Sequence, residues 1–246
     1  MGVVGSAGPA YPFQVPLSPA HPAAVLPLQR LGLPLSALVI GSLAPDLPVY
    51  LPVGVDYQTT HSGWGISVDV VIGLALLWLW FALLRDAVVD LTPSLRTRAP
   101  ARVRLDRRAW LLAPLALAIG AATHVLWDSA THDWGFIVEE LPLLREQYGA
   151  MRGYQWLQQL STAAGSIAVA AYCVHQMKKK AVVHRSPAVQ HSGLWLVPVA
   201  LSALAVGLAS RDPEAAVGAG LIALVVVAIG WRVARQPSPA VVAGDR

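Results

Sequence analysis

Histidine and aspartate recur at a helical spacing in the middle of the chain, in the run His124, Asp128 and His132. Residues at i, i+4 and i+8 share one face of a helix, with about 12 Å between the first and the last. One metal ion does not easily reach both histidines, but Asp128 lies between them and can bridge two ions. Imidazole and carboxylate suit zinc, iron or manganese, and water on such an ion ionises near neutral pH and becomes a nucleophile. A helix end with hydrogen-bonded histidines is the alternative interpretation of this run.

The composition excludes a soluble globular monomer. Only 13% of the 246 residues are charged and 55% are hydrophobic, and the mean hydropathy is +0.54. An ordinary soluble domain has about 25% charged residues. Disorder is excluded by the same numbers, because disordered chains are poor in apolar residues. The single cysteine, Cys173, excludes an internal disulfide framework and a thiolate-rich zinc ribbon.

Apolar segments predict an all-α, polytopic membrane protein with about five transmembrane helices. A spanning helix needs about 20 mostly apolar residues. The segments that meet or approach this length are 66–84, 110–127, 160–177, 195–210 and 215–233. A sixth apolar stretch, 33–44, has 12 residues and is bounded by prolines. It would reach about 18 Å, well short of a hydrocarbon core of about 30 Å, so we expect a short N-terminal re-entrant or interfacial helix.

Basic residues predict the orientation of these spans. The stretches 85–109, 178–194 and 231–246 carry 14 of the 18 Lys and Arg residues. With five spans these stretches all lie on one side, which the positive-inside rule makes cytoplasmic. We therefore expect a multi-pass protein of the cell membrane, plasma or inner, with the N-terminus outside and the C-terminus in the cytoplasm. Because topology explains the arginine-rich loop, no nucleic-acid partner is expected.

The same spans divide the chain. The predicted membrane-embedded core, 20–177, carries the His/Asp residues, and a basic cytoplasmic loop, 178–194, follows it. A C-terminal helical hairpin, 195–233, completes the membrane part. The ends, 1–19 and 236–246, are predicted to be flexible tails.

This topology brings further ionisable residues to the outer side, beside the run described first. They are His21, Asp46 and His61. Ionisable groups at membrane depth are costly and usually functional. Asp69, one turn into the first span, is either a partner of a ligating histidine or a carboxylate favoured by the helix N-terminus. Two interpretations, contact with a substrate headgroup or polar packing at the interface, also stand for Gln158, Ser161 and Thr162.

Several motifs together resemble a known family over residues 12–177. They are the runs 18–27, 35–46, 61–62, 123–132 and 157–162, which read SPAHPAAVLP, LSALVIGSLAPD, HS, THVLWDSATH and LQQLST. They resemble an uncharacterised bacterial family of integral membrane proteins, domain-of-unknown-function family 4184. The family name supplies no reaction.

A more distant likeness does imply one. The order of the histidines and aspartates is similar to the ligand order of inner-membrane metal-dependent hydrolases and of zinc-dependent phospholipase C. This resemblance implies a multinuclear zinc site for phosphoester hydrolysis, with ligands His21, Asp46, His61, His124, Asp128 and His132. The chain departs from the phospholipase pattern in its shorter final Asp-x3-His spacing, and it lacks a downstream His-x3-Glu pair and an N-terminal tryptophan. We therefore expect one or two ions and no third.

The favoured function is a membrane-bound, metal-dependent hydrolase acting at the outer membrane interface. Its substrate would be a phospholipid or another lipid-linked phosphoester that reaches the site from the bilayer. Asp46 and Asp128 are the predicted catalytic residues, one of them a candidate general base. The competing interpretation is a non-enzymatic membrane protein in which the same residues form a structural metal clamp or a polar cluster. A structural site is closed by protein ligands, whereas a catalytic site keeps an open position.

Overall fold

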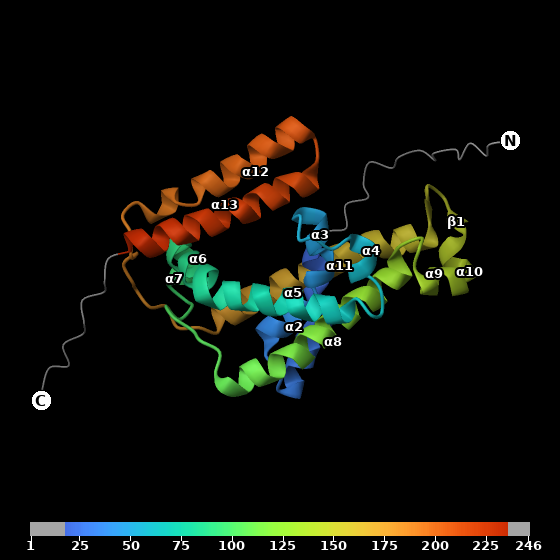
Figure 1. Cartoon of the computed structure of the whole chain (residues 1–246), viewed down its shortest axis with the longest axis horizontal. Coiled ribbons are helices and arrows are strands. Elements are labelled where there is room, and N and C mark those ends of the chain that lie inside the picture. The colour runs from blue at the N-terminus through green and yellow to red at the C-terminus, as the bar shows by residue number, and fades with distance from the viewer. Residues whose placement is uncertain (1–17, 236–246) are drawn as a thin grey trace, which may run out of the picture.

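Helices dominate the computed structural model, which describes residues 18–235 (Figure 1). Within this part of the chain the strands are one short antiparallel pair, β1 (Gln147–Tyr148) with β2 (Met151–Arg152). The predicted all-α class is confirmed. The predicted tails lie outside the described residues, except for Ser18 and Pro19, which belong to the 3-10 turn η1 (Ser18–Ala20).

Four helical stretches in residues 18–235 are long and apolar enough to cross a membrane. They are Ile66–Leu91, Arg107–Glu140, Ser192–Ser210 and Pro213–Ala234. The first consists of α5 (Ile66–Leu79), a π-helical turn (Trp80–Leu84) and α6 (Arg85–Leu91), and the second of α8 (Arg107–Thr131) and the short α9 (Phe136–Glu140). The last two contain α12 (Val197–Ser210) and α13 (Pro213–Ala234). The chain is a polytopic helical membrane protein, as its composition predicts.

The predicted span 160–177 lies in α11 (Gly153–Lys178) and differs from the other four. With 26 residues, α11 would be about 39 Å long, which is enough to cross a bilayer. Its glutamines, serines and threonine make it less apolar than the four candidate spans, so it is not one of the four helices that qualify by length and composition together.

Contacts at both of its ends nevertheless show that α11 runs the length of the helix bundle. Near its start, Ser161 accepts a hydrogen bond of 3.3 Å from the indole of Trp127, which lies in the last two turns of α8. At its other end, the carbonyl of Met177 accepts a bond of 3.3 Å from Arg98, in the loop before α8. The chain thus returns along α11 to the end of the bundle where α8 begins.

A hairpin of two helices, α12 and α13, forms the C-terminal part (Figure 1). Its helix α13 starts at a sharp turn, where the Asp212 side chain accepts bonds from the backbone N–H groups of Glu214 and Ala215. Near the other end of α13, the Trp231 indole donates a 2.8 Å bond to the Asp90 carboxylate on α6. These contacts fix the hairpin against the first candidate span.

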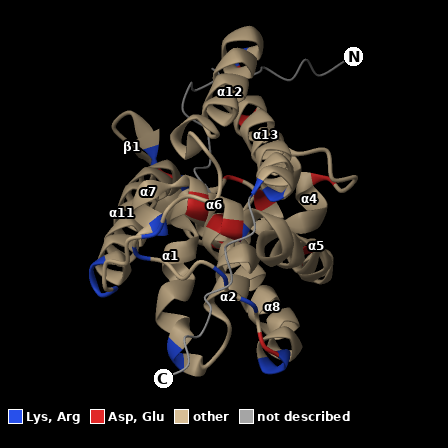
Figure 2. Cartoon of the chain, turned by 90° about the vertical axis from the view of Figure 1, so that its left-hand side faces the viewer, with Lys and Arg blue, Asp and Glu red and all other residues tan. Residues whose placement is uncertain are grey.

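Arginines gather at the end of the bundle where α6 and α7 (Pro93–Arg96) lie, and Figure 2 views the molecule from this side. Arg85 binds the carboxylate of Asp86 at 2.9 Å, and Arg96 donates to Ser192 at 3.2 Å. The second bond brings the start of the C-terminal hairpin to the same end as the arginine-rich loop. The basic stretches therefore share one end of the fold.

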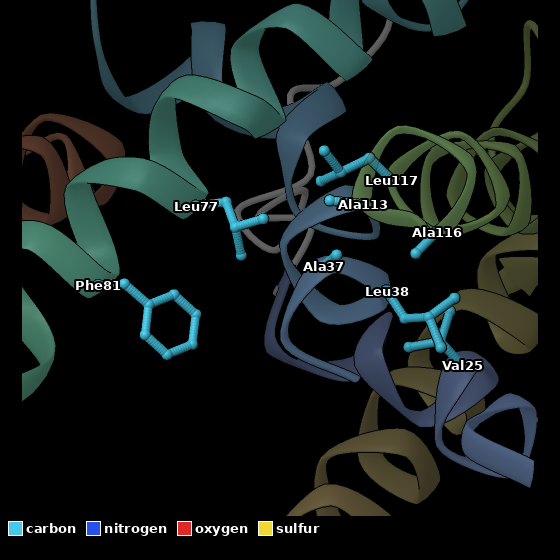
Figure 3. Packing of buried hydrophobic residues seen from close by; sticks show 8 residues of the cluster. All are labelled: Val25, Ala37, Leu38, Leu77, Phe81, Ala113, Ala116 and Leu117. Atoms are coloured by element: carbon cyan, nitrogen blue, oxygen red, sulfur yellow. The ribbon is translucent and has the colours of Figure 1, made fainter. Parts of the chain in front are cut away.

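The short helix α2 (Leu35–Gly41) is enclosed by α5 and α8 (Figure 3). Its Ala37 and Leu38 side chains are fully buried in a core shared with Leu77 and Leu117. Backbone at membrane depth that is not part of a spanning helix is tolerated only when protein or a water-filled cavity surrounds it. The predicted 12-residue apolar stretch is therefore an internal helix, and of the two predicted forms this position favours the re-entrant one.

Glycines allow α2 to touch α8 directly. A Cβ atom on Gly41 would collide with the backbone of Leu117, and one on Gly120 would collide with the backbone of Leu38 and Ser42. Small residues at such crossings let helix backbones approach closely. This contact sets the distance between Ser42 and the residue one turn beyond Gly120, which is His124.

Short helical turns connect the longer helices. On the N-terminal side they are α1 (Pro22–Val25), η2 (Leu26–Leu31), η3 (Ala44–Asp46), α3 (Leu47–Tyr50) and α4 (Tyr57–Thr60). Further along they are α10 (Pro142–Arg145) and η5 (Ser192–Leu194). The turns on the N-terminal side carry or adjoin three of the predicted ligands.

Candidate metal centre

Four side chains from separate parts of the chain meet near the C-terminal end of α8. Asp46 ends η3, His61 follows α4, and His124 and Asp128 lie one turn apart on α8. All four are buried, and each offers a ligand atom within 4.8 Å of the other three. This group could hold a metal ion.

Five of the six separations among the ligand atoms are close to those around a four-coordinate ion. The Nε2 atoms of His61 and His124 are 3.2 Å apart. The Oδ2 atom of Asp128 lies 3.4 Å from the first and 3.3 Å from the second. The Oδ1 atom of Asp46 lies 3.5 Å and 3.4 Å from the same two nitrogens. Around a tetrahedral ion with bonds of about 2.0–2.1 Å, neighbouring ligand atoms are about 3.3–3.4 Å apart.

Backbone carbonyls orient both imidazole rings toward the centre. The Nδ1 atom of His124 lies 2.8 Å from the carbonyl oxygen of Ser42, and the Nδ1 atom of His61 lies 2.9 Å from that of Tyr57. Because a carbonyl can only accept, each Nδ1 is assigned as the donor. In the neutral ring each Nε2 then carries a lone pair that faces the centre. Such an outer partner fixes the tautomer of a metal-ligating histidine.

The Asp128 carboxylate has the surroundings of a ligand. It is 1% exposed, and neither of its oxygens has a hydrogen-bond partner among the described residues. Its near neighbours are imidazole nitrogens. A buried carboxylate is costly unless a cation or hydrogen-bond donors compensate its charge. The centre therefore brings together lone pairs and negative charge, which a cation would balance.

Local contacts hold the N-terminal ligands in place. The hydroxyl of Thr60 donates a buried 2.7 Å bond to the carbonyl of Pro45, which ties α4 to the residue before Asp46. The ring of Tyr57 stacks on that of His61, with centroids 3.7 Å apart. Burial opposes the charged form of His61, but the carboxylates of Asp128 and Asp46 outweigh it and raise its pKa.

His21 and His132 lie on the other side of Asp128. The Nε2 atom of His21 is 3.5 Å from Asp128 Oδ1, and its ring stacks on that of His124 at 3.8 Å. Burial, reinforced by the neighbouring His124, lowers the pKa of His21 to about 4, so this ring is neutral at pH 7. The Nδ1 atom of His132 is 3.8 Å from the same carboxylate oxygen. Asp128 thus turns one oxygen toward the buried group and the other toward these two rings.

A pocket opens beside this second group of residues. Its empty volume is about 260 Å³, and His21, Asp128 and His132 form part of its wall. Gln158, Ser161 and Thr162 of α11 form another part. The Gln158 amide nitrogen lies 3.2 Å from the Nε2 atom of His132.

The structure thus brings four of the six predicted ligands into one group, Asp46, His61, His124 and Asp128. His21 and His132 adjoin the group through Asp128. That each of the six binds a metal stays a prediction. The residues that orient the ligands were not predicted: they are Ser42, Tyr57 and Thr60. Two of them use backbone oxygens, which no side-chain pattern reveals, and only the short spacing from Tyr57 and Thr60 to His61 gives a signal.

Asp69, one candidate partner for a ligating histidine, is near enough to interact with the charges of His61 and His124, but it hydrogen-bonds neither ring. It is fully buried on α5, and neither of its carboxylate oxygens has a hydrogen-bond partner among the described residues. The partners of the ligating rings are backbone carbonyls instead.

The fold and the centre together define a class, a polytopic helical membrane protein with a buried His/Asp group suited to a metal ion. Comparison with protein families identifies the family of the chain and assigns no function to it. The model of the family described as "Domain of unknown function (DUF4184)" matches residues 15–238, so the chain belongs to this family. No curated protein matches the chain, and no solved structure does.

Proposed function

We propose that this protein is a membrane-bound, zinc-dependent hydrolase of a phosphoester or lipid-linked substrate, acting at the outer membrane interface. The observation that carries the proposal is that Asp128 takes part in two sites at once. It belongs to the buried four-residue group and also forms part of the wall of an open pocket. A substrate in the pocket would therefore lie next to the ion that the group holds.

Zinc is the ion that the ligand atoms favour. Two imidazole nitrogens and two carboxylate oxygens are common zinc ligands, and their separations of 3.2–3.5 Å suit tetrahedral coordination. An octahedral magnesium ion, with bonds of about 2.1 Å, would bring neighbouring ligands to about 3.0 Å and would prefer oxygen. A second ion would take the free side of Asp128, with His21 and His132, which gives a content of one or two ions.

The chain's own residues supply the remaining parts of a hydrolysis. When bound, zinc lowers the pKa of a coordinated water to about 7 and stabilises charge on phosphate oxygens. Asp46 and Asp128 hold the ion, and the pocket-facing oxygen of Asp128 can accept the proton of the attacking water. The water oxygen bonds to phosphorus, the P–O ester bond breaks, and the departing alcohol takes up the proton.

The arrangement of charge supports an extracytoplasmic site. The arginine contacts of Arg85, Arg96 and Arg98 lie at one end of the bundle. The His/Asp group lies toward the opposite ends of α5 and α8. By the positive-inside rule, the arginine end faces the cytoplasm. A reporter inserted after Asp56 should then be extracytoplasmic, and a cytoplasmic signal there would contradict this orientation.

A structural metal clamp is the second candidate, and one observation favours it. Four protein ligands are enough to close a tetrahedral site, and closed sites are typical of structural zinc. The ion would then tie the segment that carries Asp46 and His61 to α8. The two candidates agree on metal content and differ in catalysis.

Metal content is the first test. Detergent-purified wild-type protein should contain stoichiometric zinc by mass spectrometry, and the variants Asp46→Ala and His124→Ala should lose it. His175→Ala and Asp133→Ala are matched controls, because both side chains are exposed and lie outside the group. Wild-type protein that takes up no metal even after reconstitution would leave only a polar cluster and would overturn both candidates.

Hydrolysis separates the two candidates. The zinc-loaded protein should hydrolyse bis(p-nitrophenyl) phosphate in detergent, lose this activity with a chelator and regain it with zinc. His124→Ala should be inactive, whereas His175→Ala should match wild type. Stoichiometric zinc without hydrolysis of this diester or of phospholipids would favour the clamp.

A further inference from the structure

A polar stripe on α11 faces the candidate centre. Gln158, Ser161 and Thr162 stand at i, i+3 and i+4, which places them on one face of the helix. All three line the pocket beside Asp128. The stripe contributes to the polar content that makes α11 less apolar than the four candidate spans. Polar side chains on a helix within the membrane cost free energy, so their presence on α11 indicates that they bind a ligand.

Hydrogen bonds hold this stripe in a fixed arrangement. Ser161 accepts from the Trp127 indole at 3.3 Å and donates to the backbone carbonyl of Gln158 at 3.1 Å. The Gln158 amide meets the His132 ring at 3.2 Å. The stripe is therefore attached to α8 through Trp127 and to His132, the residue that follows α8.

The residues that line the pocket favour a ligand whose only charged group is its phosphate. None of the described residues that line it is Lys or Arg, and its one carboxylate, Asp128, belongs to the candidate centre. An acidic headgroup would call for arginine or lysine, and an ammonium headgroup for a free carboxylate or an aromatic cage. Amide and hydroxyl groups donate and accept at once, so they pair well with the hydroxyls of a polyol.

Apolar side chains on the same two helices surround this polar wall. Leu126 on α8 and Leu157 and Leu160 on α11 are exposed, at 56%, 36% and 64%. In a bilayer these side chains contact lipid. The pocket is open on one side, and its empty volume of about 260 Å³ includes that open space. A headgroup would enter from the open side while its acyl chains stay in the membrane.

We infer that the stripe Gln158, Ser161 and Thr162 forms a headgroup subsite for a membrane phosphodiester whose headgroup is an uncharged polyol, such as glycerol. This inference rests on the proposed hydrolase. The same chemistry could be offered by a soluble glycerophosphodiester, but the exposed leucines favour the lipid.

The test compares two lipids and one soluble compound on the zinc-loaded full chain. Wild type in mixed micelles should hydrolyse phosphatidylglycerol at least about tenfold faster than phosphatidylcholine, since loss of one or two hydrogen bonds costs about this factor. Thr162→Val and Gln158→Leu should bring the ratio of the two rates toward one while zinc content stays unchanged. Ser166→Ala, a hydroxyl on α11 outside the pocket lining, should keep the wild-type ratio.

Each other outcome has a definite meaning. Equal rates for the two lipids in wild type, or a ratio that both stripe variants leave intact, would overturn the subsite. Deacylated glycerophosphoglycerol hydrolysed as fast as the lipid would overturn the membrane source.

Failure of the proposed hydrolase is distinguished by bis(p-nitrophenyl) phosphate. If this diester is not hydrolysed, binding is measured by tryptophan fluorescence, with Trp127→Phe used to assign the signal from the pocket wall. Phosphatidylglycerol micelles should change the Trp127 signal and phosphatidylcholine micelles should not. The same response to both lipids would overturn the subsite independently of catalysis.

Discussion

Replacing Gly120 by alanine tests whether the contact between α2 and α8 shapes the metal centre. The new Cβ atom would lie 2.7 Å from the backbone nitrogen of Ser42 and 2.9 Å from the carbonyl carbon of Gly41, and closer still to the carbonyl oxygen of Leu38. Carbon contacts are optimal at about 3.5 Å or more, so α2 must retreat by at least about 0.8 Å. Both neighbours are backbone atoms and cannot swing aside as a flexible side chain would.

This displacement acts on His124, one turn along α8. Its Nδ1 atom lies 2.8 Å from the Ser42 carbonyl oxygen, and a retreat of that size would open the distance to about 3.6 Å, beyond hydrogen-bonding range. Overpacking costs about 1–3 kcal/mol and the lost bond about 1 kcal/mol in free energy of unfolding. Loss of such an outer partner typically weakens metal binding by about 10–100-fold.

The assay needs a glycine control, because alanine alone stabilises a helix by about 1 kcal/mol relative to glycine. Gly220 is suitable, since it lies inside α13 and its added Cβ atom would meet only Ala203, at an ordinary 3.5 Å. Zinc affinity is measured by competition with a chelator, and stability by thermal unfolding in detergent. Gly120→Ala should be less stable than Gly220→Ala by about 2–4 kcal/mol and should bind zinc more weakly. If the two variants match in both measurements, the contact does not control the centre.

Three other measurements test other parts of the fold and the centre. Thr60→Val removes the 2.7 Å bond to the Pro45 carbonyl and should cost about 1–3 kcal/mol in thermal unfolding, with weaker zinc binding; unchanged affinity would mean that α4 is positioned without it. Asp90→Ala removes the acceptor of the Trp231 indole and should lower the free energy of unfolding by about 1.5–3 kcal/mol. Zinc affinity should stay at the wild-type value. A loss of zinc would contradict the separation of the C-terminal hairpin from the metal centre. Calorimetry in buffers of different ionisation enthalpy should show that zinc binding at pH 7 releases protons. An ordinary histidine carries about a quarter of a proton at pH 7. The raised pKa of His61 leaves its ring protonated more often than that, and zinc displaces this proton. The release should rise as pH falls toward 6, and no release in wild type would contradict the raised pKa.

Much of the fold follows from local patterns in the sequence. Hydropathy predicts helices at all five proposed spans, and the structure has a helix at each. Four of them are long and apolar enough to cross a membrane. The fifth, α11, is less apolar because of its polar residues, although its length and course match those of its neighbours. Helical spacing likewise predicts that His124 and Asp128 share a face, and the structure brings both to the centre.

The rest of the site depends on packing that no local pattern contains. Asp46 reaches the centre only because α2 is enclosed by α8, and that position depends on Gly41 and Gly120. His132 does not continue the helical face, because α8 ends at Thr131 and the chain becomes extended there. Its distance from Asp128, 3.8 Å between Nδ1 and Oδ1, is therefore set by the end of the helix and not by the i+4 spacing of a continuous helix.

The enclosed position of α2 also constrains how the protein is made. A helix of seven residues leaves unpaired carbonyl and amide groups at both ends, which acyl chains cannot satisfy. It has no stable place in the bilayer until α5 and α8 are inserted on either side of it. Synthesis delivers α2 before α5 and α8, so α2 reaches its enclosed position only after both of these helices have been made. Assembly of the His/Asp group is thus a late event in biogenesis, one that reports that the first helical hairpin is complete.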